Sequence, residues 1–278
     1  MITERDVVLD DGRVLRVHDT GPGSGERVVL WHHGSPQTGA LLPPLLEAAA
    51  QRSVRLVSYG RPSYGGSSPL PGRDVASAAG DVAQLADALG LDRFATMGAS
   101  GGGPHALACA ALLPERVTGA AVLAGVAPWT GEPSWFAGMA APGALRAALE
   151  GREARARYAE TDEFDAEVFT AADWAALDGP WASLGEDSQR AGQDGTDGLV
   201  DDDVAYASLW GVDLSAVTAP VLLVQGGQDR MVPPSHVELL RRALPHAEVW
   251  LRPHDGHVSV LAACPAALDW LLSSAGQR

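Results

Sequence analysis

Lysine is absent from this chain of 278 residues, so all 20 of its basic residues are arginines. This absence excludes chemistry that depends on a lysine, such as Schiff-base catalysis, a pyridoxal-phosphate linkage or a phosphate-loop lysine. Asp and Glu together number 35, which gives a formal net charge of −15. Because contact with nucleic-acid phosphates requires a basic surface, we expect no nucleic-acid partner.

Long hydrophobic runs and cysteines are also scarce. No stretch reaches the roughly 18 consecutive apolar residues of a membrane-spanning helix, and residues 1–10 lack the apolar region of a signal peptide. We therefore expect no membrane partner and a cytoplasmic location. The two cysteines, Cys109 and Cys264, lie in apolar segments and give neither a disulfide framework nor a zinc spacing. No metal and no other cofactor is expected.

Strand and helix patterns alternate through most of the chain. Short apolar or alternating runs predict strands at 6–9, 14–19, 27–33, 54–59, 93–97, 117–124, 220–225 and 247–251. Apolar residues at helical spacing predict helices at 41–51, 74–89, 102–113, 234–243 and 258–272. Such alternation predicts an α/β fold with a mostly parallel sheet covered by helices on both faces. Functional groups of such sheets collect at the carboxyl ends of the strands.

The alternation breaks in the middle of the chain, where no clear strand is present. Residues 128–210 hold five of the eight tryptophans, and their 17 acidic residues and five arginines contribute −12 to the net charge. We interpret residues 128–212 as an inserted helical cap, with helices predicted at 144–159 and 166–177. Residues 1–127 and 213–278 then form the two parts of the core domain. The arginines at 152, 155 and 157 are read as a solvated helix face.

A nucleophile motif follows the predicted strand 93–97. Gly98-Ala99-Ser100-Gly101-Gly102 matches the pattern Gly-x-Ser-x-Gly between a strand and a helix. The turn is so sharp that the serine takes a strained backbone conformation, and the flanking glycines leave room for it. We predict that Ser100 is the nucleophile, at a helix N-terminus that favours developing negative charge.

An oxyanion site is predicted beside the nucleophile, because acyl transfer requires two N–H donors aimed at the developing charge. One is the amide of Gly101, which follows the nucleophile. The other is expected from the loop after the early strand, at Ser35 in His33-Gly34-Ser35-Pro36. An ordinary strand-exit turn is the alternative interpretation of this loop. His33 is expected to hold the loop by hydrogen bonds.

A serine nucleophile requires a histidine base and a carboxylate that fixes the tautomer of that histidine. His257 follows the last predicted strand and precedes the final helix, with His254 as the alternative. Asp229 follows the strand 220–225, and its position gives the order Ser, Asp, His. The predicted catalytic triad is therefore Ser100, Asp229 and His257.

With these motifs the chain resembles the α/β-hydrolase superfamily over nearly all its length. The loop 61–68 is also similar to the Arg-Pro-Gly-x-Gly-x-Ser loop of that superfamily, although Ser63 stands in place of its first glycine. The resemblance implies an eight-stranded sheet with a helical cap between strands six and seven. Epoxide hydrolases and haloalkane dehalogenases share the His-Gly-x-Pro string but use an aspartate nucleophile, so Ser100 argues against both.

These observations predict a serine hydrolase that forms an acyl-enzyme. The acidic cap should repel anionic substrates, which favours a neutral, partly hydrophobic ester or lactone. Trp129 and Trp135 are candidates to line the substrate pocket, with packing between cap and core as the alternative. Amide or C–C bond hydrolysis on the same triad, a lyase and a ligand-binding receptor stay open. The sequence also leaves open whether the protein is a monomer or a homodimer.

Overall fold

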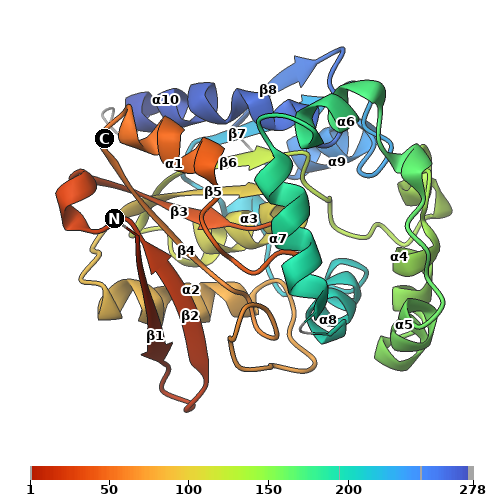
Figure 1. Ribbon diagram of the computed structural model, residues 1–278, viewed down its shortest axis with the longest axis horizontal. Helices are drawn as coiled ribbons and strands as arrows, with labels where there is room; N and C mark the ends of the chain where they lie inside the picture. The colour runs from red at the N-terminus through yellow and green to blue at the C-terminus, as the bar shows by residue number, and fades with distance from the viewer. Residues whose placement is uncertain (1, 194, 245, 275–278) are drawn as a thin grey trace.

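An eight-stranded sheet forms the centre of the protein, of which the computed structural model describes residues 2–193, 195–244 and 246–274 (Figure 1). The strand order is β1-β2-β4-β3-β5-β6-β7-β8. Strand β2 pairs antiparallel with β1 and β4, and the other neighbouring strands pair parallel. The strands are β1 (Thr3–Val8), β2 (Val14–Asp19), β3 (Arg27–His32), β4 (Val54–Tyr59), β5 (Phe94–Ala99), β6 (Val117–Leu123), β7 (Val221–Gly226) and β8 (Ala247–Arg252). The predicted fold class, α/β with a mostly parallel eight-stranded sheet, is confirmed.

Helices cover both faces of this sheet. Helices α1 (Pro43–Ala50) and α10 (Cys264–Ser274) contribute to one hydrophobic cluster, and α2 (Ser77–Ala88), α3 (Gly102–Leu112) and α9 (Ser235–Ala243) contribute to the other. Successive side chains of a strand point to opposite faces. Both layers of the core can therefore be filled from one strand, which is why central strands such as β6 and β7 are mainly apolar.

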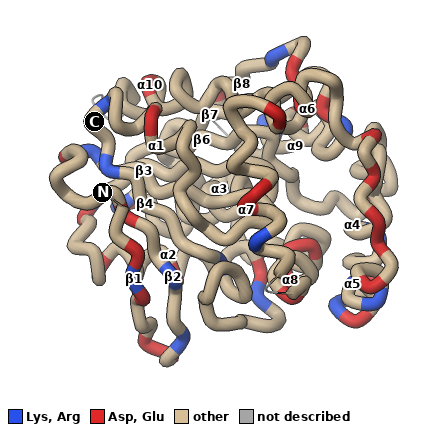
Figure 2. Tube along the Cα trace, in the orientation of Figure 1, with Lys and Arg blue, Asp and Glu red and all other residues tan. Residues whose placement is uncertain are grey.

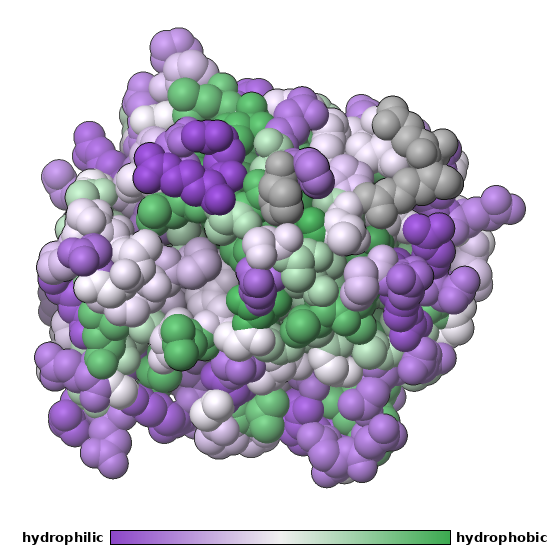
Figure 3. All heavy atoms as spheres, turned by 180° about the vertical axis from the view of Figure 1, so that it is seen from behind, coloured by the Kyte–Doolittle hydropathy of each residue, from purple (hydrophilic) through white to green (hydrophobic). Residues whose placement is uncertain are grey.

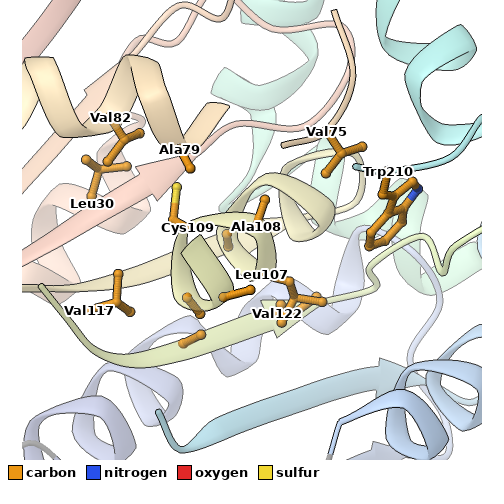
Figure 4. Close-up of a cluster of buried hydrophobic side chains, with 14 of the residues drawn as sticks. Leu30, Val75, Ala79, Val82, Leu107, Ala108, Cys109, Val117, Val122 and Trp210 are labelled. Atoms are coloured by element: carbon orange, nitrogen blue, oxygen red, sulfur yellow. The ribbon is translucent and has the colours of Figure 1, made fainter. Parts of the chain in front are cut away.

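Strand β6 shows how one strand serves both layers. Ala120 and Val122 belong to the cluster under α2 and α3, whereas Ala121 and Leu123 belong to the cluster under α1 and α10. Figure 4 shows Val122 close to Leu107 of α3, within the first of these clusters.

The described residues between β6 and β7 form five α-helices. They are α4 (Gly143–Leu149), α5 (Arg152–Ala159), α6 (Ala171–Leu177), α7 (Ala182–Gln193) and α8 (Asp197–Tyr206). Short 3-10 turns occur at η1 (Pro22–Ser24), η2 (Pro133–Phe136), η3 (Ala166–Val168), η4 (Leu214–Ala216) and η5 (Ser259–Ala263). The segment 128–212, called the insert below, shows no strand in its described residues. Figure 1 shows the insert on one side of the molecule and both termini on the opposite side.

Three predicted helices differ from the structure. The predicted helix 144–159 is two helices, because Gly151 takes a φ of +100° between α4 and α5. The predicted helix 166–177 is the turn η3 followed by α6, which starts with a capping box between Thr170 and Asp173. The predicted helix 258–272 begins as η5 and continues as α10.

Arginines of the insert pair with its own acidic residues. Arg155 is 1% exposed and its Nε lies 2.7 Å from Oδ2 of Asp203, so the prediction of a solvated face is wrong at this position. Arg152 contacts Asp197 and Asp201 in the same way. Figure 2 shows the acidic residues distributed over the insert, with basic residues beside several of them.

The molecular surface mixes both kinds of residue. Seen from behind, hydrophilic residues dominate the rim and hydrophobic residues are visible nearer the centre (Figure 3). Among the described residues, no helix combines the length and the apolar character that crossing a membrane requires.

Candidate active site

Ser100 lies in a sharp turn between β5 and α3. Its φ is +52°, a strained left-handed conformation for a residue with a side chain, and its N–H donates to the carbonyl of Leu123 at 2.8 Å. A Cβ on Gly98 would lie 2.4 Å from the carbonyl oxygen of Gly102, and a Cβ on Gly102 would lie 2.0 Å from that of His32. Both glycines are therefore required for the turn that presents Ser100 at the start of α3.

The structure brings together the three residues of the predicted triad. Nε2 of His257 lies 3.0 Å from Oγ of Ser100, and Nδ1 of His257 lies 2.8 Å from Oδ2 of Asp229. Oδ1 of Asp229 accepts hydrogen bonds from the N–H groups of Met231 at 2.9 Å and Val232 at 2.8 Å. The carboxylate is thereby fixed after β7, with its other oxygen directed at the histidine.

The environment of His257 favours its charged form. Burial lowers the pKa of this imidazole, but the charge and hydrogen bond of Asp229, together with the charge of Asp173, outweigh burial and raise the pKa above its ordinary value. The carboxylate at Nδ1 requires a proton on that nitrogen, so in the neutral ring Nε2 is free to accept one from Ser100. This is the protonation pattern of a general base.

The loop after β3 lies beside the serine. Nε2 of His33 accepts the N–H of Arg61 at 3.1 Å, so Nδ1 carries the proton that it donates to the carbonyl of Gly34 at 2.6 Å. His33 thus fixes the loop by hydrogen bonds. For the predicted oxyanion donors, Ser35 and Gly101, no acceptor for the backbone N–H is found among the described residues.

A buried network of hydrogen bonds connects this loop to the insert, and no sequence motif indicates it. Oδ2 of Asp202, in α8, accepts hydrogen bonds from Oγ of Ser35 at 2.6 Å and from Nη2 of Arg61 at 2.7 Å. The hydroxyl of Tyr206, also in α8, donates to the carbonyl of Gly101 at 2.9 Å. Asp202 stands in a run of three aspartates, and only the fold distinguishes it from its neighbours.

A cavity of about 480 Å³ opens at Ser100 and His257. Its polar lining includes Gln37, whose Oε1 accepts the N–H of Gly34 at 2.6 Å and whose Nε2 is without a partner among the described residues. The remaining lining is mainly apolar and comes from both the core and the insert: Trp31, Pro36, Leu42, Phe164, Phe169, Trp174, Leu177, Trp181, Leu184, Met231, Val258 and Leu261. No arginine is found among the described residues that line it.

Trp129 and Trp135 do not belong to the residues that line this cavity within the described chain. The indole N–H of Trp135 donates to the carbonyl of Ala127 at 3.1 Å, and its ring packs edge-on against Trp129, Phe136 and His236. Their placement corresponds to packing between insert and core, because both belong to or pack against the hydrophobic cluster under α2, α3 and α9. Trp174 and Trp181 of the same insert line the cavity instead.

The described residues offer no cluster of three or more His, Cys, Asp or Glu side chains suited to a metal ion. Cys109 and Cys264 are buried free thiols, and burial raises the pKa of both. Neither thiol therefore has the lowered pKa that a reactive cysteine requires.

Comparison with known proteins places the chain in a family. The sequence model of the alpha/beta hydrolase fold family matches residues 27–262. A 2-hydroxy-6-oxononadienedioate/2-hydroxy-6-oxononatrienedioate hydrolase of Paraburkholderia phymatum is 31% identical over 259 residues, which cover 90% of this chain and 87% of that protein. The protein of the same name from Burkholderia vietnamiensis is 37% identical over 141 residues, about half of either chain (49% and 48%).

A solved structure shows the same fold. The bromoperoxidase of Bacillus anthracis matches with a TM-score of 0.76 over 98% of this chain and 100% of its own, at 23% sequence identity. The family match and the match to the Paraburkholderia protein together extend over most of the chain. The chain therefore belongs to the α/β-hydrolase fold family.

Proposed function

We propose that this α/β hydrolase is a serine hydrolase that cleaves neutral, partly hydrophobic carboxylic esters or lactones through an acyl-enzyme. The observation that carries the proposal is the hydrogen-bonded chain from Ser100 to His257 at 3.0 Å and on to Asp229 at 2.8 Å, at the wall of an apolar cavity. A serine hydroxyl becomes a useful nucleophile when a histidine takes its proton and a carboxylate orients that histidine.

In the proposed reaction, Nε2 of His257 takes the proton of Ser100 as Oγ attacks the carbonyl carbon. The resulting imidazolium is stabilised by Asp229 and then protonates the departing alkoxide. Water, deprotonated by His257, attacks the acyl-enzyme and releases the acid. The strained turn at Ser100 keeps the nucleophile in place through both steps.

The N–H groups of Ser35 and Gly101 are the proposed oxyanion donors. Both are without an acceptor among the described residues, and the cavity is lined by Ser35 and Ser100 together. Such donors stabilise charge that develops in the transition state, and loss of one commonly costs about 100- to 1,000-fold in kcat. The start of α3 at Gly102 adds the favourable end of a helix dipole.

The lining of the cavity supports the neutral substrate class. Burying a carboxylate without a cation is costly, and no described lining residue is an arginine. The nearby Arg61 is fully committed to Asp202, to the carbonyl of His33 and to Oγ of Ser35. Gln37 Nε2 is an uncharged donor that can serve an oxygen of a neutral substrate.

A second candidate is hydrolysis of a C–C bond on the same triad. The names of the two relatives favour it, because each denotes a hydrolase of a dienedioate or trienedioate. A dioate carries two carboxylates, and the described residues that line the cavity include no arginine to receive them. We therefore rank this candidate below the neutral ester or lactone.

The proposal is tested by mass spectrometry after treatment with a fluorophosphonate probe, followed by peptide mapping. Labelling at Ser100 that is lost in Ser100→Ala and strongly slowed in His257→Gln is the expected result. A folded protein that is labelled elsewhere or not at all would overturn the proposed nucleophile. Turnover of p-nitrophenyl esters and lactones, compared with turnover of a 2-hydroxy-6-oxodienoate, then separates the two candidates.

A further inference from the structure

Three aspartates of the insert are fully buried against the catalytic loops. Asp173 of α6, Asp187 of α7 and Asp202 of α8 each have 0% relative exposure. Burial of an ionised carboxylate is unfavourable unless hydrogen bonds or cations compensate it. The partners of each aspartate therefore identify what its burial achieves.

Asp173 contacts the segment that follows His257. Its Oδ1 accepts hydrogen bonds from the N–H of Val258 at 2.8 Å, the N–H of Ser259 at 2.7 Å and the hydroxyl of Ser259 at 2.8 Å. Its Oδ2 accepts from the N–H and the hydroxyl of Thr170, within the insert, at 2.9 and 2.8 Å. Oδ2 of Asp173 thus binds the first residue of its own helix cap, and Oδ1 binds the backbone at the start of η5.

The same contact reaches the residue before His257. Oγ of Ser259 accepts the N–H of Gly256 at 2.7 Å while its own proton points at Asp173. A Cβ on Gly256 would lie 2.0 Å from Oδ2 of Asp173, so the carboxylate fits only against a glycine. The backbone on both sides of His257 is therefore held, directly or through Ser259, by a carboxylate of the insert.

Asp187 and Asp202 make the corresponding contacts with the loop after β3. Asp187 accepts the N–H of Thr38 at 3.0 Å and its hydroxyl at 2.6 Å. Asp202 accepts the hydroxyl of Ser35 at 2.6 Å. Two helices of the insert thus fix the loop that carries the backbone N–H of Ser35.

The charge of Asp202 is compensated within the core domain. Burial acts to raise the pKa of this carboxyl, but Arg61 and Arg73 hold it well below its ordinary value. Its neighbour Asp203 differs, because the partner of Asp203 is Arg155 of the insert itself, and burial raises the pKa of Asp203 to about 6. Asp202 therefore pairs with arginines outside the insert, whereas Asp203 pairs with an arginine inside it.

We propose that Asp173, Asp187 and Asp202 are positioning residues, through which the insert holds the loop of the general base and the oxyanion loop in their working geometry. The insert then acts as a part of the catalytic apparatus besides contributing to the wall of the cavity. The inference rests on the proposed function for the roles of Ser35 and His257, and the contacts themselves do not depend on it.

The test compares Asp173→Asn and Asp202→Asn with Asp203→Asn, a matched control that breaks a buried ion pair inside the insert. The pKa of His257 is measured by NMR titration and assigned with His257→Gln, so that this readout does not require turnover. The charges that bear on this imidazole are those of Asp229 and Asp173. Thermal unfolding of every variant reports its stability, and kcat and KM are measured with p-nitrophenyl valerate.

We expect Asp173→Asn to lower the pKa of His257 by roughly 0.5 unit or more and to reduce kcat about 10-fold or more. Asp202→Asn should reduce kcat by a similar factor of about 10 and leave the pKa of His257 within about 0.2 unit. The control Asp203→Asn should lower the unfolding temperature while it leaves kcat and that pKa close to wild type. Equal effects of all three variants on all readouts would overturn the proposal.

A second pair of variants covers the case in which Asp173→Asn does not fold. Ser259→Ala removes the hydroxyl on the histidine side of Asp173, and Thr170→Ala removes the hydroxyl on the insert side. We expect kcat to fall about 10-fold in the first and less than about two-fold in the second. Equal kcat in the two variants would refute a positioning role of Asp173. If wild-type Ser100 is not labelled by the probe, the proposed function fails, and the NMR comparison of these variants still decides whether Asp173 controls His257.

Discussion

A carboxylate on the substrate should be rejected by the cavity at Ser100. The perturbation is the replacement of a terminal methyl group by a carboxylate, as in p-nitrophenyl valerate and mono-p-nitrophenyl glutarate. Both esters have acyl chains of the same length and the same leaving group, so their intrinsic reactivity is similar. Apart from His257, the described lining residues include no group that can carry a positive charge.

The magnitude follows from the cost of desolvating an ion. Removal of a carboxylate from water into a site without a cation costs several kcal/mol. The cavity also includes polar groups such as Gln37 and Ser188, so the bound carboxylate is not fully desolvated. We therefore take a desolvation cost of about 3 kcal/mol. Since each 1.4 kcal/mol is tenfold, kcat/KM for the glutarate ester should be about 100-fold lower.

A substitution at Gln189 tests whether the cavity itself causes the difference between the two esters. Gln189 lines the cavity from α7 at an exposed position that tolerates a longer side chain. Gln189→Arg should narrow the difference between the two esters by roughly tenfold, and Gln189→Met, a neutral control of similar size, should leave it unchanged. Equal kcat/KM for both esters in the wild type would refute the reasoning and favour a dicarboxylate substrate.

Three further predictions follow from the geometry. The labelling rate of Ser100 should rise with pH through the pKa of His257, because only the neutral ring accepts a proton, and the midpoint should lie above the ordinary value of about 6.5. The raised pKa of His257 also stabilises the folded state, and this stabilisation has the opposite pH dependence to the labelling rate. It is complete at low pH and is lost as the pH rises through the pKa of His257. In Gly101→Ala the new Cβ would lie 2.4 Å from the hydroxyl of Tyr206, so kcat for an ester should fall about 10-fold or more, and Gly101→Ala/Tyr206→Phe should recover part of it. Arg155→Met should lower the unfolding free energy in urea by about 3–5 kcal/mol, because Asp203 loses its partner, and Arg155→Met/Asp203→Leu should restore most of it.

Each of these predictions has a clear contrary outcome. A labelling rate with its midpoint below that of free histidine would contradict the raised pKa of His257. Normal kcat in Gly101→Ala would show that α8 moves aside without disturbing the loop at Ser35. A double variant at 155 and 203 as unstable as Arg155→Met alone would show that packing, rather than the unpaired charge, accounts for the loss.

Much of the site was predictable because the fold places local sequence motifs in a known order. The turn at Ser100 requires small residues at Gly98 and Gly102, so the motif itself carries the geometric requirement. Asp229 and His257 each follow a strand of the sheet, and the carboxyl ends of parallel strands meet at one edge. Local steric requirements and the periodicity of the strands were therefore sufficient to predict that Ser100, Asp229 and His257 lie close together.

The lining of the cavity was not predictable in the same way. Trp129 and Trp135 follow β6 directly, whereas Trp174 and Trp181, which line the cavity, come later in the insert. Trp174 lies in α6 and Trp135 in η2, whereas Trp129 and Trp181 lie in connecting segments. The sequence pattern does not tell which neighbours each of these side chains contacts. Which tryptophans line the cavity is therefore decided by the tertiary placement of the insert.

Tertiary structure also decided which acidic residues of the insert are buried and what they contact. Composition gives the insert its strong negative charge, and from this charge the sequence predicts a cap that repels anionic substrates. Asp173, Asp187 and Asp202 are buried instead, where backbone N–H groups, hydroxyls and arginines from distant parts of the chain compensate them. By itself the sequence determined the sheet, the turn at Ser100 and the placement of Asp229 and His257 after strands of the sheet, because these depend on local sterics and periodicity. Only the tertiary structure decided which aspartates contact the loops beside Ser100 and His257, because a buried charge is compensated by partners that lie far away in the sequence.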